Sequence, residues 1–118
     1  MNLWATYCGP CRAETPFFAA LHKELGPRGV EFVGLTTEDP ARDAQKVREF
    51  AREFDVPYRL GWAGRDFARE LKRGGSDNIP QTFIYRRDGR LLTRFTGYSA
   101  ESSPAKIRSA IEQALAAE

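Results

Sequence analysis

The chain's only two cysteines, Cys8 and Cys11, constrain its fold most strongly because they mark a junction between two patterns. A short apolar run precedes the pair and a helical pattern follows it. A strand that delivers two cysteines to the first turn of a helix places both sulfur atoms beside backbone N–H groups that lack intrahelical partners. That helix end carries about half a positive charge, which stabilises a nearby anion by roughly 0.3–1 kcal/mol. We therefore expect a thiol whose pKa lies about one unit below the free value of about 8.5.

The two thiols are expected to play different roles. We assign Cys8 as the attacking nucleophile because it begins the helix and faces solvent, and Cys11, about one turn further on, as the resolving thiol. Gly9 lets another chain approach closely, and Pro10 suits a first helical turn. A zinc half-site and a pair of inert core thiols are the alternatives. Zinc would need two more ligands, and the chain has no further cysteine and one histidine, His22, so we favour redox chemistry.

The residues around this pair resemble a known superfamily. Residues 4–12 are similar to the active-site segment of thioredoxin-like proteins, and the continuation over 12–16, which contains Glu14 and Pro16, narrows the resemblance to the TlpA/ResA type. Ile79-Pro80 and Gly97-Tyr98 extend it over nearly the whole chain. The resemblance implies an α/β thioredoxin-like fold with a mixed sheet of four or slightly more strands and helices on both faces. It also implies a membrane-anchored or periplasmic reductase.

Length and charge exclude several classes of protein. The 118 residues fit one thioredoxin-like domain over 1–118, and a net charge of +2 is too small to indicate nucleic acid or an anionic membrane as partner. No run of 18 apolar residues is present, so we expect no membrane span. Only residues 2–6 remain for the strand before the cysteines. We therefore expect the strand to be truncated, in which case any signal or anchor would precede Met1 and the compartment is left open.

Periodicity predicts the order β-α-β-α, a small insertion, then β-β-α. The expected helices cover the residues from the cysteines to a break at 26–29, then 40–54, 66–73, and a last helix from 103. The expected strands cover 2–6, 30–36, 81–86 and 91–96, with 58–63 ambiguous. An Asp-Gly turn between the last two strands indicates a hairpin.

Glu14 lies three residues after Cys11, so the two share a helix face. An ordinary solvated carboxylate is the simplest interpretation. The resemblance implies instead a partly buried acid that takes and returns the proton of Cys11, and burial would raise its pKa toward the range useful for proton transfer. We favour this second interpretation.

The resemblance also implies that Pro80 is cis and faces the disulfide, where it keeps metal away and lets the backbone of Ile79 pair with an extended substrate segment. Gln81 departs from the threonine that is more often found there. We expect Tyr7 and Tyr98 to form an apolar docking surface with Ile79.

Other conspicuous residues receive structural roles. We place Trp4 in the core and His22 on the helix surface without a function. Four arginines on the hairpin are interpreted as charges that block edge-to-edge pairing rather than as a nucleic-acid patch; they are Arg86, Arg87, Arg90 and Arg94.

The predicted reaction is dithiol–disulfide exchange with protein substrates through a redox-active Cys8–Cys11 disulfide, with no other cofactor and no metal. Gly9-Pro10 matches thioredoxin and favours a reductant. We expect this reductant to receive its electrons from an upstream donor and to act as a monomer. The resemblance implies a role in extracytoplasmic cytochrome c maturation or disulfide reduction. The alternatives are a disulfide oxidant or isomerase, and a binding module whose thiols are structural or carry Cu(I).

Overall fold

The computed structural model describes residues 1–117. These residues form a five-stranded sheet with helices packed against it. The strands stand in the order β3-β2-β1-β4-β5, with β1, β2 and β3 parallel and β4 and β5 antiparallel to their neighbours. Their bounds are Asn2–Trp4, Val33–Thr36, Arg59–Trp62, Gln81–Tyr85 and Leu91–Thr96 for β1 to β5. The predicted mixed sheet is confirmed, and the ambiguous segment 58–63 contributes its edge strand β3.

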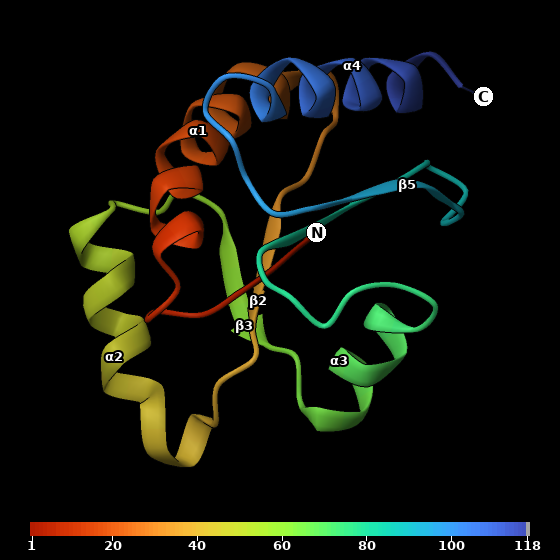
Figure 1. Ribbon diagram of the computed structural model, residues 1–118. Helices are drawn as coiled ribbons and strands as arrows, with labels where there is room; N and C mark the ends of the chain where they lie inside the picture. Colours follow the sequence, from red (N-terminus) through yellow and green to blue (C-terminus); the bar gives the residue numbers. More distant parts are fainter. Residues whose placement is uncertain (118) are drawn as a thin grey trace.

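Helices cover both faces of the sheet, as predicted (Figure 1). Neighbouring residues of a strand point to opposite faces, so Trp4 packs with Phe50 of α2 while Leu3 packs with Ala68 of α3. Ile84 of β4, on the Trp4 side, packs against α1 and α4. In Figure 1, β5 runs between α4 above it and α3 below it. The helices are α1 (Gly9–Leu25), α2 (Pro40–Glu53), α3 (Arg65–Lys72) and α4 (Ser103–Ala116).

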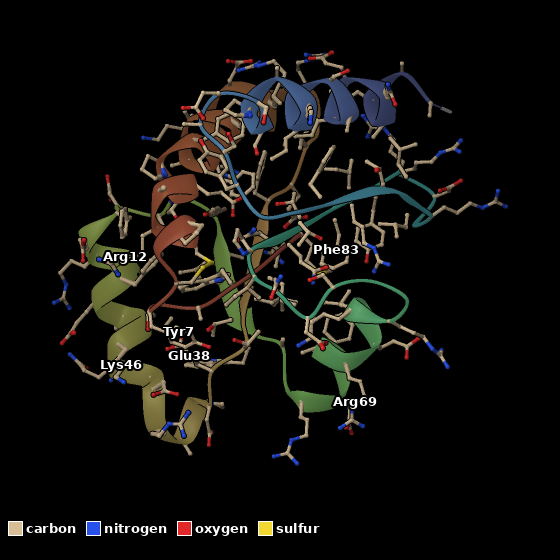
Figure 2. The ribbon with its side chains drawn as sticks, in the orientation of Figure 1. Tyr7, Arg12, Glu38, Lys46, Arg69 and Phe83 are labelled. Atoms are coloured by element: carbon tan, nitrogen blue, oxygen red, sulfur yellow. A yellow bond between two sulfur atoms is a disulfide. The ribbon has the colours of Figure 1, made fainter. Side chains whose placement is uncertain are left out.

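The core lies between these layers. Its largest cluster joins the apolar stripes of α1 and α4, in which Phe18, Leu21 and Ile107 are almost completely buried. Burying a side chain of this size contributes about 1.5–3 kcal/mol each, so this cluster fixes α1 against the sheet. On the other face, Phe83 lies between β5 and α3 (Figure 2). The helices predicted from periodicity are confirmed.

Two segment boundaries differ from the sequence prediction for local reasons. The first strand ends at Trp4 rather than at residue 6, because the backbone N–H of Cys8 donates to the Ala5 carbonyl at 3.2 Å and closes a turn there. The second strand begins at Val33 rather than at residue 30, since a short 3₁₀ turn, η1 (Gly26–Arg28), and Gly29 at φ 94° come before it. Gly29 suits that left-handed conformation because it has no Cβ.

Two side chains lie elsewhere than predicted. His22 is half-buried, and its ring packs edge-on against Phe32 and Tyr58 at centroid distances of 5.8 and 6.1 Å. Arg94 does not point along the sheet edge, because its guanidinium donates to the carbonyls of Leu71 and Arg73 at 3.2 Å each. These carbonyls lie at the end of α3, so Arg94 caps that helix.

Candidate active site

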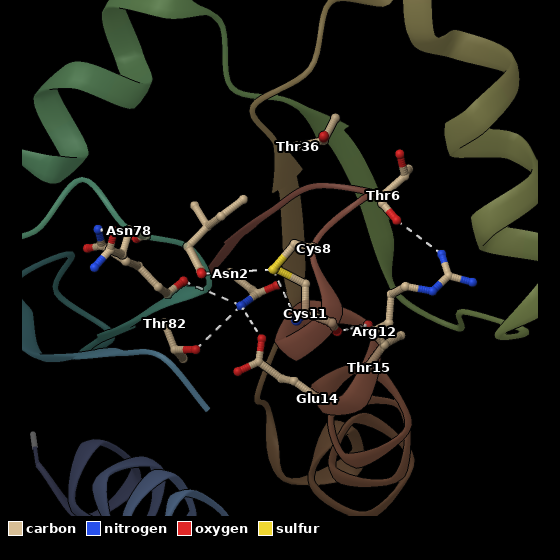
Figure 3. Close-up of a disulfide and its surroundings, with 12 residues drawn as sticks. Asn2, Thr6, Cys8, Cys11, Arg12, Glu14, Thr15, Thr36, Asn78 and Thr82 are labelled. Atoms are coloured by element: carbon tan, nitrogen blue, oxygen red, sulfur yellow. Dashed lines mark hydrogen bonds between the residues drawn. A yellow bond between two sulfur atoms is a disulfide. The ribbon is translucent and has the colours of Figure 1, made fainter. Parts of the chain in front are cut away.

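Cys8 and Cys11 form a disulfide at the beginning of α1 (Figure 3). Cys8 is the N-cap of the helix, and its Sγ accepts a hydrogen bond from the backbone N–H of Cys11 at 3.2 Å. The unpaired N–H expected from the motif therefore points at the outer sulfur. An N–H in this position stabilises a thiolate at Cys8 once the disulfide is reduced.

The two sulfurs differ less in exposure than the sequence suggested. Cys11 is 1% exposed, and Cys8 is only 7% exposed rather than open to solvent. The segment before β4 covers Cys8, whose Sγ lies 3.8 Å from the carbonyl oxygen of Ile79. Cys8 is nevertheless the outer sulfur of the pair, so the order of access that the motif predicted is retained.

The loop that covers Cys8 contains a cis peptide bond between Ile79 and Pro80, as the resemblance implied. The Pro80 carbonyl accepts the backbone N–H of Gly97 at 2.8 Å. Gln81 is fully buried, and its Nε2 donates to the carbonyls of Ser76 and Asn78. Gln81, the unexpected residue after Pro80, thus stabilises the loop through hydrogen bonds from its buried side chain. The sequence contains no signal for this role, because any polar residue could occupy the start of β4.

Glu14 lies in the interior on the same face of α1 as Cys11, with an exposed fraction of 1%. Its Oε1 accepts a hydrogen bond from Nδ2 of Asn2 at 2.8 Å, whereas its Oε2 has no partner among the described residues. Burial raises the pKa of Glu14 to about 8, although the Asn2 bond acts in the opposite direction. Asn2, a β1 residue that sequence reasoning did not single out, is therefore the carboxyl's one hydrogen-bond donor here.

The residues expected to form the docking surface come from three segments: the loop and first turn at the beginning of α1, the loop before β4 and the segment after β5. Tyr7 is 75% exposed and directly precedes Cys8. Ile79 is half-buried and belongs to the cluster around the cysteines. Tyr98 packs against Phe17 of α1 with their ring centroids 6.3 Å apart. Gly9 and Pro10 are exposed in the first turn of α1. Trp4 lies in the core, as predicted.

Sequence reasoning missed two charged residues that bind the loop before Cys8. Glu38, in the segment after β2, accepts hydrogen bonds from the backbone and the hydroxyl of Thr6. Arg12, in the first turn of α1, donates to the carbonyl of Thr6 at 3.1 Å. Thr6 lies 32 residues before Glu38, so only the register of β1 on β2 brings them together.

The described residues can be compared with the requirements of a metal site, a membrane span and a ligand cavity. Within residues 1–117, no three His, Cys, Asp or Glu side chains are placed so that they could hold an ion. Over the same residues, each helix is too short or too polar to cross a lipid bilayer. A cavity of about 340 Å³ is lined by Met1, Phe18 and Ile107 among others, but neither cysteine borders it.

Comparison with known proteins gives consistent matches. The sequence pattern of the Redoxin family matches residues 1–113. The chain is 34% identical over 99 residues to the thiol:disulfide interchange protein HelX of Rhodobacter capsulatus, covering 82% of this chain and 51% of HelX. It is 26% identical over 113 residues to the thiol-disulfide oxidoreductase ResA of Oceanobacillus iheyensis, covering 88% and 56%. The chain thus spans about half the length of these curated relatives.

Solved structures match the fold. A thiol:disulfide interchange protein of the thioredoxin family from Chlorobium tepidum superposes with a TM-score of 0.81 at 26% identity, covering 97% of this chain and 77% of that one. StoA from Bacillus subtilis superposes with a TM-score of 0.73 at 16% identity, covering 92% and 78%. The thioredoxin-like fold that the sequence predicted is confirmed.

Proposed function

Because this chain belongs to the Redoxin family and is a TlpA/ResA-like member of the thioredoxin superfamily, we propose that it exchanges disulfides with protein substrates through Cys8 and Cys11. The observation that carries this proposal is the disulfide at the N-terminus of α1, whose outer sulfur accepts a backbone N–H. A structural disulfide would not need that hydrogen bond, whereas a thiolate nucleophile gains from it. The curated relatives are named as thiol-disulfide oxidoreductases or interchange proteins, which supports the same reaction.

In the reducing direction, the reaction starts from the dithiol form. The Cys8 thiolate attacks one sulfur of a substrate disulfide, so a Cys8–substrate bond forms and the second substrate sulfur leaves as a thiolate that takes up a proton. The Cys11 thiolate then attacks Sγ of Cys8 and displaces the first substrate sulfur, which is also protonated. Two electrons pass to the substrate, and the Cys8–Cys11 disulfide forms again.

Glu14 is proposed to accept the proton of Cys11 before the second attack and to return it when the pair is reduced. A pKa raised to about 8 by burial makes its carboxylate basic enough to deprotonate a thiol near neutral pH. Its Oε2, which has no partner in the described part of the chain, leaves one position on the carboxyl group for that proton.

The substrate is proposed to lie across the first turn of α1 and the cis-proline loop. Ile79, beside Cys8, offers backbone groups to an extended segment, and Pro80 places no metal ligand near the sulfurs. Tyr7 and Tyr98 provide aromatic surface for the substrate. Gly9 and Pro10 are small and exposed, so the substrate can approach the first turn of α1 closely.

The direction of transfer and the setting follow from the resemblance. Gly9-Pro10 favours a reductant. We propose that it receives electrons from an upstream donor, that it needs no metal or organic cofactor, and that it acts as a monomer. We place the protein in an extracytoplasmic compartment, where cytochrome c maturation is the expected use. A disulfide oxidant or isomerase is the alternative enzyme, and a reduction potential near that of thioredoxin, about −270 mV, would separate the two. A thiol-bearing binding module is the non-enzymatic alternative.

Turnover of a protein disulfide tests the proposal. Reduction of insulin is measured with wild-type protein, C8S and C11S, with a small-molecule thiol as electron donor. C8S is expected to lose turnover, and C11S to accumulate a mixed disulfide visible by intact mass. Undiminished turnover by C8S would overturn the mechanism.

A further inference from the structure

The loop before Cys8, residues 5–7, decides where the outer sulfur lies. It joins the end of β1 at Trp4 to the N-cap of α1, and it contains the 75%-exposed Tyr7. Within residues 1–117 no strand pairs with this loop, so its position depends on the burial of Ala5 in the core, on the turn bond from Cys8 to Ala5 and on what binds Thr6. A shift of the loop would move Cys8 Sγ away from the N–H of Cys11.

Glu38 binds Thr6 through both of its carboxylate oxygens. Its Oε1 accepts the backbone N–H of Thr6 at 2.8 Å, and its Oε2 accepts the Thr6 hydroxyl at 2.6 Å. A third donor, the hydroxyl of Thr36 at the end of β2, reaches Oε1 at 2.7 Å. The backbone N–H of Glu38 donates back to that hydroxyl at 3.2 Å. The carboxylate is therefore fixed to β2 on one side and to the loop on the other.

Arg12 completes the set of bonds to Thr6. Its guanidinium donates to the Thr6 carbonyl, makes two hydrogen bonds to Glu53 of α2, and lies over the rings of Phe50 and Phe54 at 5.5 and 5.0 Å. The N–H, the hydroxyl and the carbonyl of Thr6 are thus all bound by charged side chains.

Simple satisfaction of buried polar groups does not account for Glu38. One N–H at a loop can be satisfied by a water or a neutral side chain. Glu38 is instead a carboxylate that is 8% exposed and makes no ion pair within 4.0 Å among residues 1–117. A buried carboxyl group without a partner charge depends on hydrogen-bond donors, and these three donors provide them. Such an arrangement is stable only when its donors are held in place, so it is sensitive to the position of the loop.

We infer that Glu38 is a positioning residue for disulfide exchange: through Thr6 it holds the loop that presents Cys8 and Tyr7 at the beginning of α1. This inference rests on the proposed function. Glu38 reaches Cys8 only through Thr6, so its effect is on the geometry of the nucleophile. The interaction that matters is the set of hydrogen bonds, which a neutral glutamine can largely reproduce, because its Nε2 can donate to the Thr6 hydroxyl oxygen.

The pH profile of Cys8 alkylation tests this inference without turnover. Iodoacetamide labelling is followed in a C11S background, in which Cys8 is the only thiol. E38A is expected to move the midpoint of the profile upward by about one pH unit and to slow labelling at pH 7 about tenfold, since the thiolate fraction falls accordingly. E38Q is expected to stay within about twofold of the parent.

D43N is the matched control. Asp43 is also a buried carboxylate, 3% exposed, but it accepts the N–H of Asp39 and pairs with Arg42 at the beginning of α2. Its loss should lower stability and leave the Cys8 profile unchanged. An E38A profile equal to that of D43N, or an E38Q profile as displaced as that of E38A, would overturn the inference.

Should E38A not fold, Thr6 provides the second comparison. T6V removes the hydroxyl bond to Oε2 and keeps the N–H bond, whereas T6S keeps both. T6V is expected to slow labelling at pH 7 about threefold relative to T6S, a factor that follows from half a unit of displacement. Equal profiles for the two would contradict the inference. Because labelling requires no substrate, failure of turnover in the wild-type protein would refute the proposed function separately.

Discussion

Two buried glutamates, Glu14 on the helix of Cys11 and Glu38 bonded to the loop before Cys8, differ in how many hydrogen-bond donors they have. Among residues 1–117, Glu14 in α1 has a single donor, Asn2, and one of its carboxyl oxygens has no partner. Glu38 after β2 has three donors, from Thr6 and Thr36, and uses both oxygens. Both are less than 10% exposed, so burial alone does not distinguish them. A carboxyl group with an unused oxygen is suited to take and release a proton, whereas one saturated with donors is suited to hold a segment in place.

The largest expected effect concerns how Glu14 makes the stability of the folded protein depend on pH. Its pKa is raised from its ordinary 4.5 to about 8 in the folded protein. The folded state therefore binds more protons than the unfolded state between these values, and the free energy of unfolding falls as pH rises from about 4.5 to about 8. At about 1.4 kcal/mol per unit, the loss amounts to at most about 5 kcal/mol.

E14Q should remove this slope. Urea denaturation of oxidised wild-type protein and E14Q, in which the cysteines do not titrate, measures the difference at each pH. The amino terminus, whose pKa is lowered to about 6 by burial, contributes equally to both proteins and cancels in the difference. Parallel curves for the two proteins would break the comparison, since Glu14 would then be no more perturbed than an ordinary carboxyl.

The next effect is on the second attack of the exchange. E14Q should slow the resolution of a Cys8 mixed disulfide by Cys11 about 100-fold at neutral pH, the lower end of what a positioned acid–base group contributes. The measurement is stopped-flow release of thionitrobenzoate from Cys8 after reaction with an aromatic disulfide. E38Q is the control, since it keeps the hydrogen bonds to Thr6. Equal resolution rates in E14Q and wild type would remove Glu14 from the mechanism.

Replacing Asn2 sharpens the comparison, because it removes the hydrogen-bond donor of Glu14. Its hydrogen bond lowers the pKa of Glu14 against the effect of burial. N2A should therefore move the pH dependence of resolution upward, and should cost about 1–3 kcal/mol of stability at high pH, where the carboxylate loses its donor. Resolution profiles at several pH values and urea titrations give the two quantities. A downward displacement in N2A would contradict this account.

The glutamates also show how far the sequence alone could lead. The spacing of Glu14 from Cys11 placed it on the inner face of α1, because helical periodicity is a local property. The same logic predicted the helices α1, α2 and α4. Glu38 and Asn2 could not be assigned in this way, since Thr6 and Glu14, the residues they bind, lie 32 and 12 residues away in the chain. Only the register of β1 between β2 and β4 brings them to the disulfide.

Boundaries failed for a related reason. The strand preceding Cys8 was predicted through residue 6, but Thr6 turns out of the sheet to bind Glu38 and Arg12. The apolar and β-branched pattern of residues 2–6 carries no sign of that turn. Sequence patterns therefore located the reacting atoms and left out the side chains that hold them.

The smallest expected effect distinguishes the buried hydrogen bonds of Glu38 to Thr6 from the exposed ion pair between Arg12 and Glu53. Glu53 pairs with Arg12 at the surface, where their side chains are 57% and 37% exposed, and such a pair contributes up to about 1 kcal/mol. E53Q removes the ion pair but leaves Arg12 over Phe50 and Phe54 and within reach of the Thr6 carbonyl. Stability should therefore change little, and the alkylation profile of Cys8 should stay that of the parent. If E53Q instead displaced the profile as far as E38A, the loop would be held mainly from the surface, and the distinction between a proton-exchanging glutamate and a loop-holding one would lose its second member.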